Sequence, residues 1–288
     1  PLGEAEVFKF ANDNTFVRIK ENIRQRDVFI VQPTCYPVND NLMELLIMID
    51  ACKRASAGRI TAVVPYYGYG RTDKKDQPRV PITARLVADL LTAAGADRML
   101  TVDLHAGQIQ GFFNIPVDEL TALPILTDYF KAKEIEDLVV VAVDIGISKK
   151  ARDVADRLHA PLAIIEKRRI GNDERTETMN VIGDVKGKVA LTFDDEIATG
   201  GTIVNAARAL AEHGVKEVFC CVTHPILSGN ASDVMAQSNF SEVVVTDTIP
   251  VSREKRNGKI TVLPVAPLLG EAIYRIHKGL SVGDLFNN

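Results

Sequence analysis

The chain has 288 residues, of which 46% are hydrophobic and 25% are charged, and its formal net charge is −4. This length and composition are typical of a globular protein and predict two domains. The slight excess of acidic residues gives no support to binding of nucleic acid through a broadly basic surface, and no apolar run is long enough to span a membrane, so neither partner is expected.

Strand-like and helix-like segments alternate along the first half of the chain. Apolar runs predict strands at 26–32, 58–66 and 97–105, and the spacing of apolar residues predicts helices at 40–55 and 83–95. Short strands made almost entirely of Val, Ile and Ala are typical of a parallel sheet that is covered on both faces.

The second half repeats this alternation. Strands are predicted at 137–144, 160–168, 188–195, 216–224 and 241–249, and helices at 149–158, 202–214 and about 266–278. We therefore predict an α/β protein with two similar domains, residues 1–125 and 126–288, each a mainly parallel sheet flanked by helices. The last helix is free to pack back on either half, including the N-terminal domain. Two polar stretches that follow strands, 70–80 and 167–180, are predicted to be mobile lids.

The four cysteines indicate a reduced environment. Cys35, Cys52, Cys220 and Cys221 form no Cys-x-x-Cys pair, and each lies in an apolar segment. This pattern argues against a disulfide framework or a zinc site and favours a cytoplasmic location.

The stretch KVALTFDDEIATGGTI (188–203) carries the strongest chemical signal. A strand should deliver Asp194 and Asp195 to the carboxyl edge of a sheet, where open α/β sheets bind ligands. The turn Thr199–Gly200–Gly201–Thr202 then opens a helix, and its backbone N–H groups suit a phosphate. Carboxylates can bind the two hydroxyls of a diol, and the neighbouring turn can bind a phosphate. Together they predict a sugar phosphate as the ligand. The alternative is an ordinary strand–turn–helix with a Thr cap and two solvated aspartates.

Three further groups of charged residues follow predicted strands. Asp103 and His105 suit a divalent metal bridged to a polyphosphate, or a proton relay. Arg71 and its neighbouring lysines suit a triphosphate, and Asp73 can orient them or face the metal. The basic run 167–169 opens the second predicted lid. Each has a plainer interpretation, namely a histidine bonded to backbone or a solvated charged surface.

The whole chain resembles the ribose-phosphate diphosphokinase family, which makes phosphoribosyl diphosphate (PRPP) on the type I phosphoribosyltransferase fold. The resemblance rests on residues 188–203 together with PYYGYGRTDKK, PITARLVADLL, VDLHAGQIQGFFNIPVDEL, AIIEKRR, VIGDVKGKVA and THPILSGNA. DLHAGQIQGFF is specific to this family rather than to the fold. The family usually begins with a further strand and helix, so the chain is expected to be short at its N-terminus.

The resemblance implies a role for each candidate residue. It implies that ribose 5-phosphate is bound by Asp194, Asp195, Thr199, Gly200, Gly201 and Thr202, and that the nucleotide is bound by Phe10, Arg71, Thr72, Asp73 and His105. The implied Mg²⁺ ligands are His105 and Asp144, and the implied catalytic residues are Lys167, Arg169 and His105. The implied reaction converts ATP and ribose 5-phosphate to PRPP and AMP.

Several positions depart from the family pattern. Asn12 and Asn14 stand where carboxylates usually read the purine, and Thr72 replaces a Gln, so the choice of nucleoside triphosphate stays open. Ile147 replaces a Gly in the loop after Asp144, and Ala198 replaces an Asp.

The resemblance also implies assembly and regulation. The family forms homo-oligomers, commonly hexamers, often regulated by ADP or phosphate. Arg24 matches a phosphate contact of the family, whereas Asn22 and Gln25 depart from the common Ser and Gly. Two alternative functions remain open. One is a phosphoribosyltransferase that consumes PRPP, and the other is a non-catalytic regulatory homologue of the synthesising enzyme.

Overall fold

A computed structural model describes residues 2–169, 177–256 and 258–286 of the chain. It divides into two compact units, which are treated separately here. Unit 1 comprises Pro1–Thr121 and Ala266–Asn288, and unit 2 comprises Ala122–Val265. The division therefore lies close to the predicted position, and the C-terminal helix belongs to unit 1.

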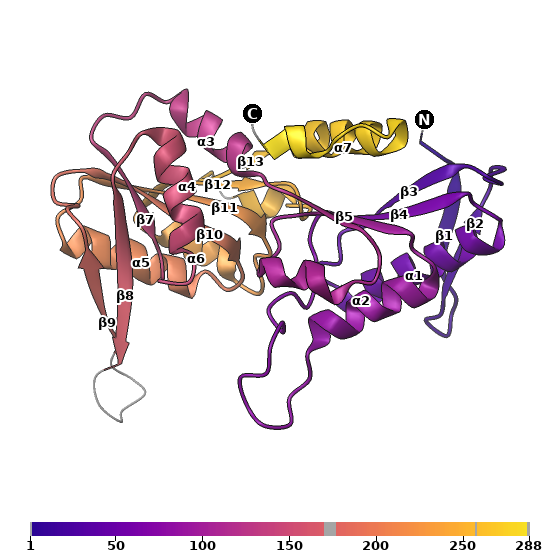
Figure 1. Ribbon diagram of the computed structural model, residues 1–288. Coiled ribbons are helices and arrows are strands. Elements are labelled where there is room, and N and C mark those ends of the chain that lie inside the picture. Colours follow the sequence, from indigo (N-terminus) through magenta and orange to yellow (C-terminus); the bar gives the residue numbers. More distant parts are fainter. Residues whose placement is uncertain (1, 170–176, 257, 287–288) are drawn as a thin grey trace. The chain divides into compact units, whose positions relative to one another are not determined.

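Unit 1 is built on a four-stranded parallel sheet in the order β3–β4–β5–β6. Its strands are β3 (Asp27–Val31), β4 (Arg59–Val64), β5 (Arg98–Val102) and β6 (Val117–Leu120). Its helices are α1 (Val38–Arg54), α2 (Thr83–Ala94), α7 (Ala266–Lys278) and the short 3₁₀ helices η1 (Gly107–Phe112) and η3 (Gly283–Phe286). Helices α1 and α2 lie on one side of this sheet and α7 on the other (Figure 1).

Helix α7 is attached to the sheet of unit 1 by polar contacts. Asp27 on β3 accepts hydrogen bonds from Arg59 on β4, and its Oδ2 lies 2.9 Å from Nδ1 of His277. Arg59 Nη2 also donates to the carbonyl of Ile276 at 3.0 Å. These contacts link strands near the start of the chain to its last helix.

An antiparallel hairpin precedes the sheet of unit 1. It consists of β1 (Ala5–Lys9) and β2 (Thr15–Ile19), which pair only with each other and pack beside α1. The alternation of the sequence did not predict this hairpin, because its side chains are largely exposed and give no apolar run.

Unit 2 is built on a seven-stranded sheet in the order β13–β12–β11–β10–β7–β8–β9. The strands are β7 (Leu138–Ala142), β8 (Leu162–Arg169), β9 (Glu177–Ile182), β10 (Val189–Ile197), β11 (Glu217–Pro225), β12 (Phe240–Thr246) and β13 (Ile260–Leu263). Only β9 is antiparallel to its neighbour. The helices are α3 (Leu123–Lys131), α4 (Ser148–Leu158), α5 (Gly201–Glu212), α6 (Ala231–Gln237) and the 3₁₀ helix η2 (Arg253–Arg256).

The sheet of unit 2 has a core on each face, which explains its continuous apolar strands. Val139 and Val141 of β7 face one core, together with residues of α5 and α6, and Val140 and Ala142 face the other, together with residues of α3 and α4. A strand buried on both faces needs apolar side chains at every position. The predicted α/β fold with mainly parallel, helix-covered sheets is confirmed.

The second predicted lid differs from the observed structure. Its two ends belong to the hairpin β8–β9, which extends well beyond the rest of the sheet (Figure 1). Residues 170–176 at its tip lie outside the described residues. The prediction treated 177–180 as loop because the strand there is mostly polar, and its pairing with β8 is what makes it a strand.

No helix in the described ranges combines the length and the apolar character needed to cross a membrane.

Candidate functional site

Strand β10 places two adjacent carboxylates at the carboxyl edge of the unit 2 sheet. Its first five residues pair in parallel with β7 and β11 and are buried or partly buried, so the strand enters the sheet as an apolar segment. Asp194 and Asp195 follow, and Asp195 retains only 6% of its exposure. The backbone N–H of Asp195 donates to Oδ1 of Asp194 at 2.9 Å, which fixes the orientation of the Asp194 carboxyl group.

The surroundings of Asp194 disfavour its charged form. Burial is the main cause, followed by the charge of Asp195, and the charge of Asp144 acts in the same direction. Together they raise the pKa of Asp194 to about 8. Carboxylates clustered in this way, with Asp195 buried and Asp144 and Asp194 partly buried, favour groups that supply hydrogens or positive charge, such as sugar hydroxyls or a cation.

The turn after β10 opens helix α5, and most of its residues are exposed. Gly200 precedes the helix with φ of 82° and is buried, whereas Thr199, Gly201 and Thr202 are exposed. The first N–H groups of a helix have no partner within the helix and carry partial positive charge, which suits an anion. In the predicted phosphate loop, Gly200 is thus buried against the protein, and the other three residues of the turn are open to solvent.

One segment of unit 2, residues 227–228, holds the backbone just before this turn. The backbone N–H of Leu227 donates to the carbonyl of Ile197, and that of Ser228 donates to the carbonyl of Ala198 at 2.9 Å. These residues belong to the THPILSGNA motif, which therefore has a structural role here. The Ala198 position uses its backbone in this contact, and nothing in the structure explains why its side chain departs from the family pattern.

Gly200→Ala should destabilise the protein more than the neighbouring change Gly201→Ala. A Cβ at Gly200 would lie 2.7 Å from Cε of the fully buried Met235, and the φ of 82° is one that alanine rarely adopts. At Gly201 the nearest atom would be Thr199 Oγ1 at an ordinary 3.9 Å. We expect Gly200→Ala to lower the free energy of unfolding by about 2 kcal/mol in urea denaturation. Gly201→Ala should leave it unchanged or raise it by up to about 1 kcal/mol, and equal losses would contradict the explanation.

The loop after β7 carries Asp144 next to the same edge. Oδ1 of Asp144 accepts the backbone N–H of Ile147 at 3.0 Å, which closes the turn into α4. Ile147 has φ of −87°, a conformation open to any residue, and its side chain packs against the cores on both faces of the sheet. The replacement of glycine by Ile147 is therefore accommodated by the backbone, and its packing explains why an apolar side chain fits.

Lys167 and Arg169 lie near the end of β8, where they pair with Met179 and Glu177 of β9. Their side chains lie outside the described part of the structure. Their predicted catalytic role thus stays a prediction.

In unit 1 a second set of candidate residues gathers where β4 and β5 end. Asp103 follows β5 with φ of 41°, an unusual conformation for a residue with a side chain, and it is buried, whereas His105 is exposed. In the loop after β4, Arg71 is exposed and Asp73 is 7% exposed. Thr72 is fixed through its backbone, because its N–H donates to Tyr69 and its carbonyl accepts from Ala84.

The structure identifies a residue that the motif analysis did not single out. Gln108 Nε2 donates to Oδ2 of Asp73 at 2.7 Å, so Asp73 is held by the DLHAGQIQGFF segment. The motif contains one glutamine on each side of an isoleucine. This spacing was the only signal in the sequence that the glutamines hold other segments.

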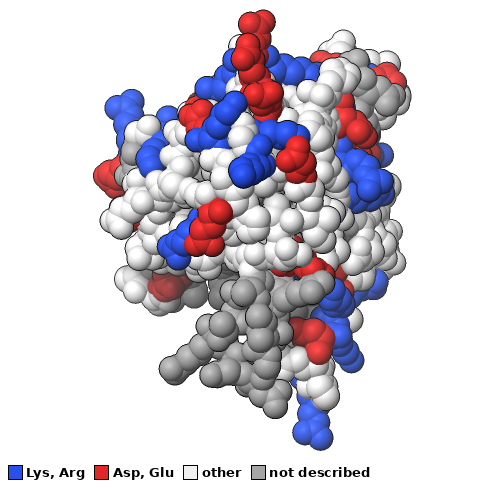
Figure 2. All heavy atoms as spheres, turned by 90° about the vertical axis from the view of Figure 1, so that its left-hand side faces the viewer, with Lys and Arg blue, Asp and Glu red and all other residues white. Residues whose placement is uncertain are grey.

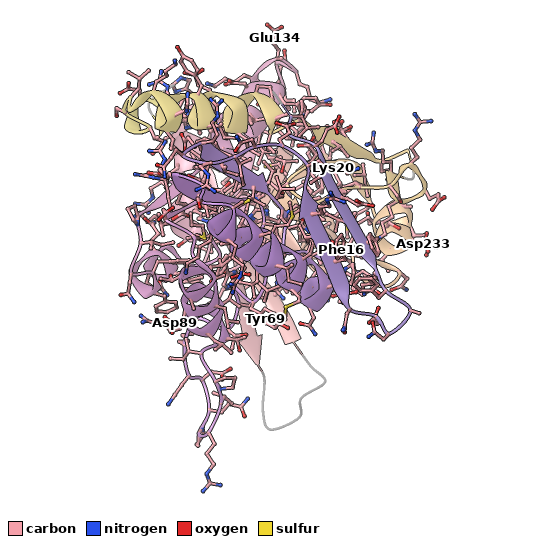
Figure 3. All side chains as sticks on the ribbon, turned by 90° about the vertical axis from the view of Figure 1, so that its right-hand side faces the viewer. Phe16, Lys20, Tyr69, Asp89, Glu134 and Asp233 are labelled. Carbon is pink, nitrogen blue, oxygen red and sulfur yellow. The ribbon has the colours of Figure 1, made fainter. Side chains whose placement is uncertain are left out.

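Phe10 lies on the β1–β2 hairpin within a cluster of three aromatic rings. The centroid of its ring lies 5.2 Å from that of Phe8 and 5.6 Å from that of Phe16, both edge-to-face, and Figure 3 marks Phe16 on this hairpin. Phe10 keeps 49% of its exposure, so a face remains open for stacking. Asn12 accepts the backbone N–H of Asn14 at 3.3 Å and so contributes to the turn of the hairpin.

The Mg²⁺ prediction can be compared with the available donor groups. Among the described residues, no group of three or more His, Cys, Asp or Glu side chains could hold a metal ion. Mg²⁺ commonly takes only one or two protein ligands and completes its shell with substrate phosphates and water. The mutually repelling carboxylates Asp144, Asp194 and Asp195 fit such a partly filled shell.

The four cysteines are buried and are not part of either group of residues. Burial raises the pKa of each thiol, that of Cys220 to about 12, so none is activated as a nucleophile. On the described surface that faces the viewer in Figure 2, acidic and basic side chains are interspersed, so attraction of an anionic substrate has to come from local groups.

Comparison with known proteins places these features in a family. Residues 1–95 match the model of the N-terminal domain of ribose phosphate pyrophosphokinase, and residues 172–287 match the phosphoribosyl synthetase-associated domain. The ribose-phosphate pyrophosphokinase of Caldanaerobacter subterraneus subsp. tengcongensis is 57% identical over 99% of this chain and 90% of its own length. That of Clostridium tetani is 55% identical over 100% of this chain and 90% of its own length.

A solved structure agrees with this assignment. The phosphoribosylpyrophosphate synthetase of Mycobacterium smegmatis matches with a TM-score of 0.92 and 46% identity, over 97% of this chain and 92% of that chain. Both family models cover separate parts of the chain, and the relatives extend over nearly all of it. The chain belongs to the ribose-phosphate pyrophosphokinase family.

Proposed function

We propose that the chain transfers the β,γ-diphosphoryl group of ATP to the 1-hydroxyl of ribose 5-phosphate, giving PRPP and AMP. The observation that carries this proposal is the arrangement on β10 and α5, in a chain of this family. Two carboxylates near the end of β10 are followed, three residues later, by a glycine turn that opens α5 and whose residues 199, 201 and 202 are exposed. A ribose 5-phosphate needs both, because its hydroxyls donate hydrogen bonds and its phosphate accepts them.

Unit 2 binds the acceptor in this proposal. Asp194 and Asp195 accept hydrogen bonds from the 2- and 3-hydroxyls, and the Thr199–Thr202 turn donates to the 5-phosphate. Holding the sugar at two points fixes its 1-hydroxyl for attack, and such positioning supplies much of the rate enhancement in reactions of this type.

Unit 1 binds the donor. Phe10 stacks on the base, while Arg71, Thr72, Asp73 and His105 hold the triphosphate. Asp73 is buried and bonded to Gln108, so it acts by orienting neighbouring groups. Since Asn12 and Asn14 carry no charge, base stacking contributes more to recognition here than charged contacts do, and the choice of base is left to experiment.

The 1-hydroxyl oxygen attacks the β-phosphorus in line, the bond from that phosphorus to the oxygen bridging the α-phosphate breaks, and AMP leaves as the hydroxyl proton is lost. Lys167 and Arg169 stabilise the negative charge that spreads over the transferring group. The proposed cofactor is Mg²⁺, for which His105 and Asp144 are the candidate ligands, and when bound it would neutralise charge on the triphosphate. We further propose a cytoplasmic homo-oligomer, a hexamer by analogy with the family.

The test is to incubate the purified chain with ribose 5-phosphate, Mg²⁺ and each of ATP, GTP, CTP and UTP, and to quantify nucleoside monophosphate and PRPP. We expect equal amounts of AMP and PRPP with ATP, and none without ribose 5-phosphate. Absence of both products at high enzyme concentration would contradict the proposal and favour a regulatory homologue. Consumption of PRPP with a nucleobase, without any need for ATP, would favour a phosphoribosyltransferase.

A further inference from the structure

The 3₁₀ helix η1 carries one apolar residue that is buried in the core of unit 1, and a polar residue stands on either side of it in the sequence. Ile109 is fully buried in this core, next to Tyr67 and Phe113. Gln108 and Gln110 stand on either side of it and are exposed. Each of these glutamines donates a hydrogen bond to a carboxylate on a different segment.

Gln110 binds Glu119, which in turn holds the turn after β5. Gln110 Nε2 donates to Oε2 of Glu119, and the other oxygen of Glu119 accepts the backbone N–H of Leu104 at 2.9 Å. Leu104 lies between Asp103, whose φ is 41°, and His105. A residue with a side chain holds such a conformation only when its surroundings impose it. Here the bonds on either side of the strained residue, from Asp103 N–H to the Leu120 carbonyl and from Leu104 N–H to Glu119, impose it.

Gln108 serves the loop after β4 in the same way, through its bond to Asp73. The segment 108–110 therefore contacts the 71–73 loop directly and the 103–105 turn through Glu119. Because Ile109 fixes this segment to the core, the two loops are held relative to one another.

We propose that Glu119 is a positioning residue for the nucleotide site, and that Gln110–Glu119 and Gln108–Asp73 together hold the 103–105 turn and the 71–73 loop in register. The proposal rests on the proposed function, since it takes these loops to bind the donor nucleotide. Glu119 does not touch the reacting atoms; it fixes the backbone that directs His105. Loss of this bond frees the backbone N–H of Leu104 and lets the strained turn relax, which misdirects the imidazole.

The experiment compares three variants by steady-state kinetics. In Glu119→Leu both hydrogen bonds are lost, and we expect kcat/KM for ATP to fall by about tenfold to a hundredfold, while KM for ribose 5-phosphate stays within about twofold. In Glu119→Gln the amide oxygen still accepts from Leu104 and Gln110 can turn its amide to match, so kcat/KM for ATP should return to within about threefold of the unaltered chain.

The matched control is Asp118→Asn on the same strand. Asp118 is the preceding residue, its side chain lies on the other face of the strand, and it is bonded to Arg98. Its loss should lower stability without altering the kinetics. Should Glu119→Leu not fold, Gln110→Leu, which leaves Glu119 in place, is expected to show the same selective loss for ATP to a smaller degree.

The outcomes separate the two proposals. Turnover by the unaltered chain establishes the function whatever the variants do. Unchanged kinetics in Glu119→Leu, equal losses for both substrates, equal losses in Asp118→Asn, or no rescue by Glu119→Gln would each overturn the positioning role. An effect that vanishes at saturating inorganic phosphate would also overturn it, because the residue would then act on regulation.

Discussion

Replacing Asp194 by Asn is expected to make the ligand-free protein more stable at pH 8 while removing its activity. The folded environment raises the pKa of Asp194 to about 8, mainly through burial and then through the charge of Asp195. An acid whose pKa is raised by folding stabilises the folded state least where it is ionised. Asp194 therefore leaves the free energy of unfolding unchanged below its unfolded pKa near 3.8. It lowers that free energy increasingly as the pH rises toward 8.

Asn removes that cost and keeps the local hydrogen bond, since its amide oxygen can still accept the N–H of Asp195. We expect urea denaturation to show a gain in the free energy of unfolding of roughly 2 kcal/mol at pH 8 and a smaller gain at pH 5. A gain that is the same at both values, or larger at pH 5, would contradict the electrostatic explanation.

Activity should move in the opposite direction. Hydroxyls of a bound sugar that donate to Asp194 favour its ionised form, which makes stronger hydrogen bonds than an amide oxygen does, and an amide offers only one acceptor oxygen. We expect kcat/KM for ribose 5-phosphate to fall by about 10³-fold in Asp194→Asn, with KM for ATP little changed. Full activity in this variant would remove Asp194 from the proposed acceptor site.

Lys167→Ala is expected to lower kcat by about 10³-fold without changing stability, because a cation that meets the transferring group only in the transition state contributes to kcat rather than to KM. Steady-state kinetics and urea denaturation measure the two effects. The control is Lys216→Ala, which removes an exposed lysine paired with Asp137 at 3.1 Å, at the opposite end of the strands. Equal losses in both variants would show that a general loss of positive charge, and not the place of Lys167, is responsible. Unaltered activity in Lys167→Ala would support a different source of transition-state charge.

The sequence predicted most of the parallel sheets, because strands buried on both faces leave continuous apolar runs such as Leu138–Ala142. It did not predict the β1–β2 hairpin or β9, whose strands are exposed or polar and are defined by pairing rather than by composition. It left open on which domain the last helix packs, since the contacts of Asp27 and Arg59 with this helix join residues more than 200 positions apart.

The sequence predicted those parts of the candidate site whose functional groups come from neighbouring residues, as in Asp194–Asp195 and the turn that follows. Supporting contacts between segments were not predictable. The motif does not indicate that Gln108 donates a hydrogen bond to Asp73. Nor does it indicate that Glu119 on β6 accepts a hydrogen bond from the turn after β5. Such pairs join residues that are distant in the sequence, here 35 and 15 positions apart, and meet only in the folded chain.

The alternation of side chains along β7 has an evolutionary consequence. Val140 contributes to the core that contains α4, which follows the Asp144 loop, whereas its neighbour Val141 contributes to the core that contains α5, which begins with the glycine turn. A change in volume at Val140 therefore bears first on α4, and one at Val141 bears first on α5. Ile147 packs against both cores, so a substitution there has to suit the acidic loop and the anion-binding turn together.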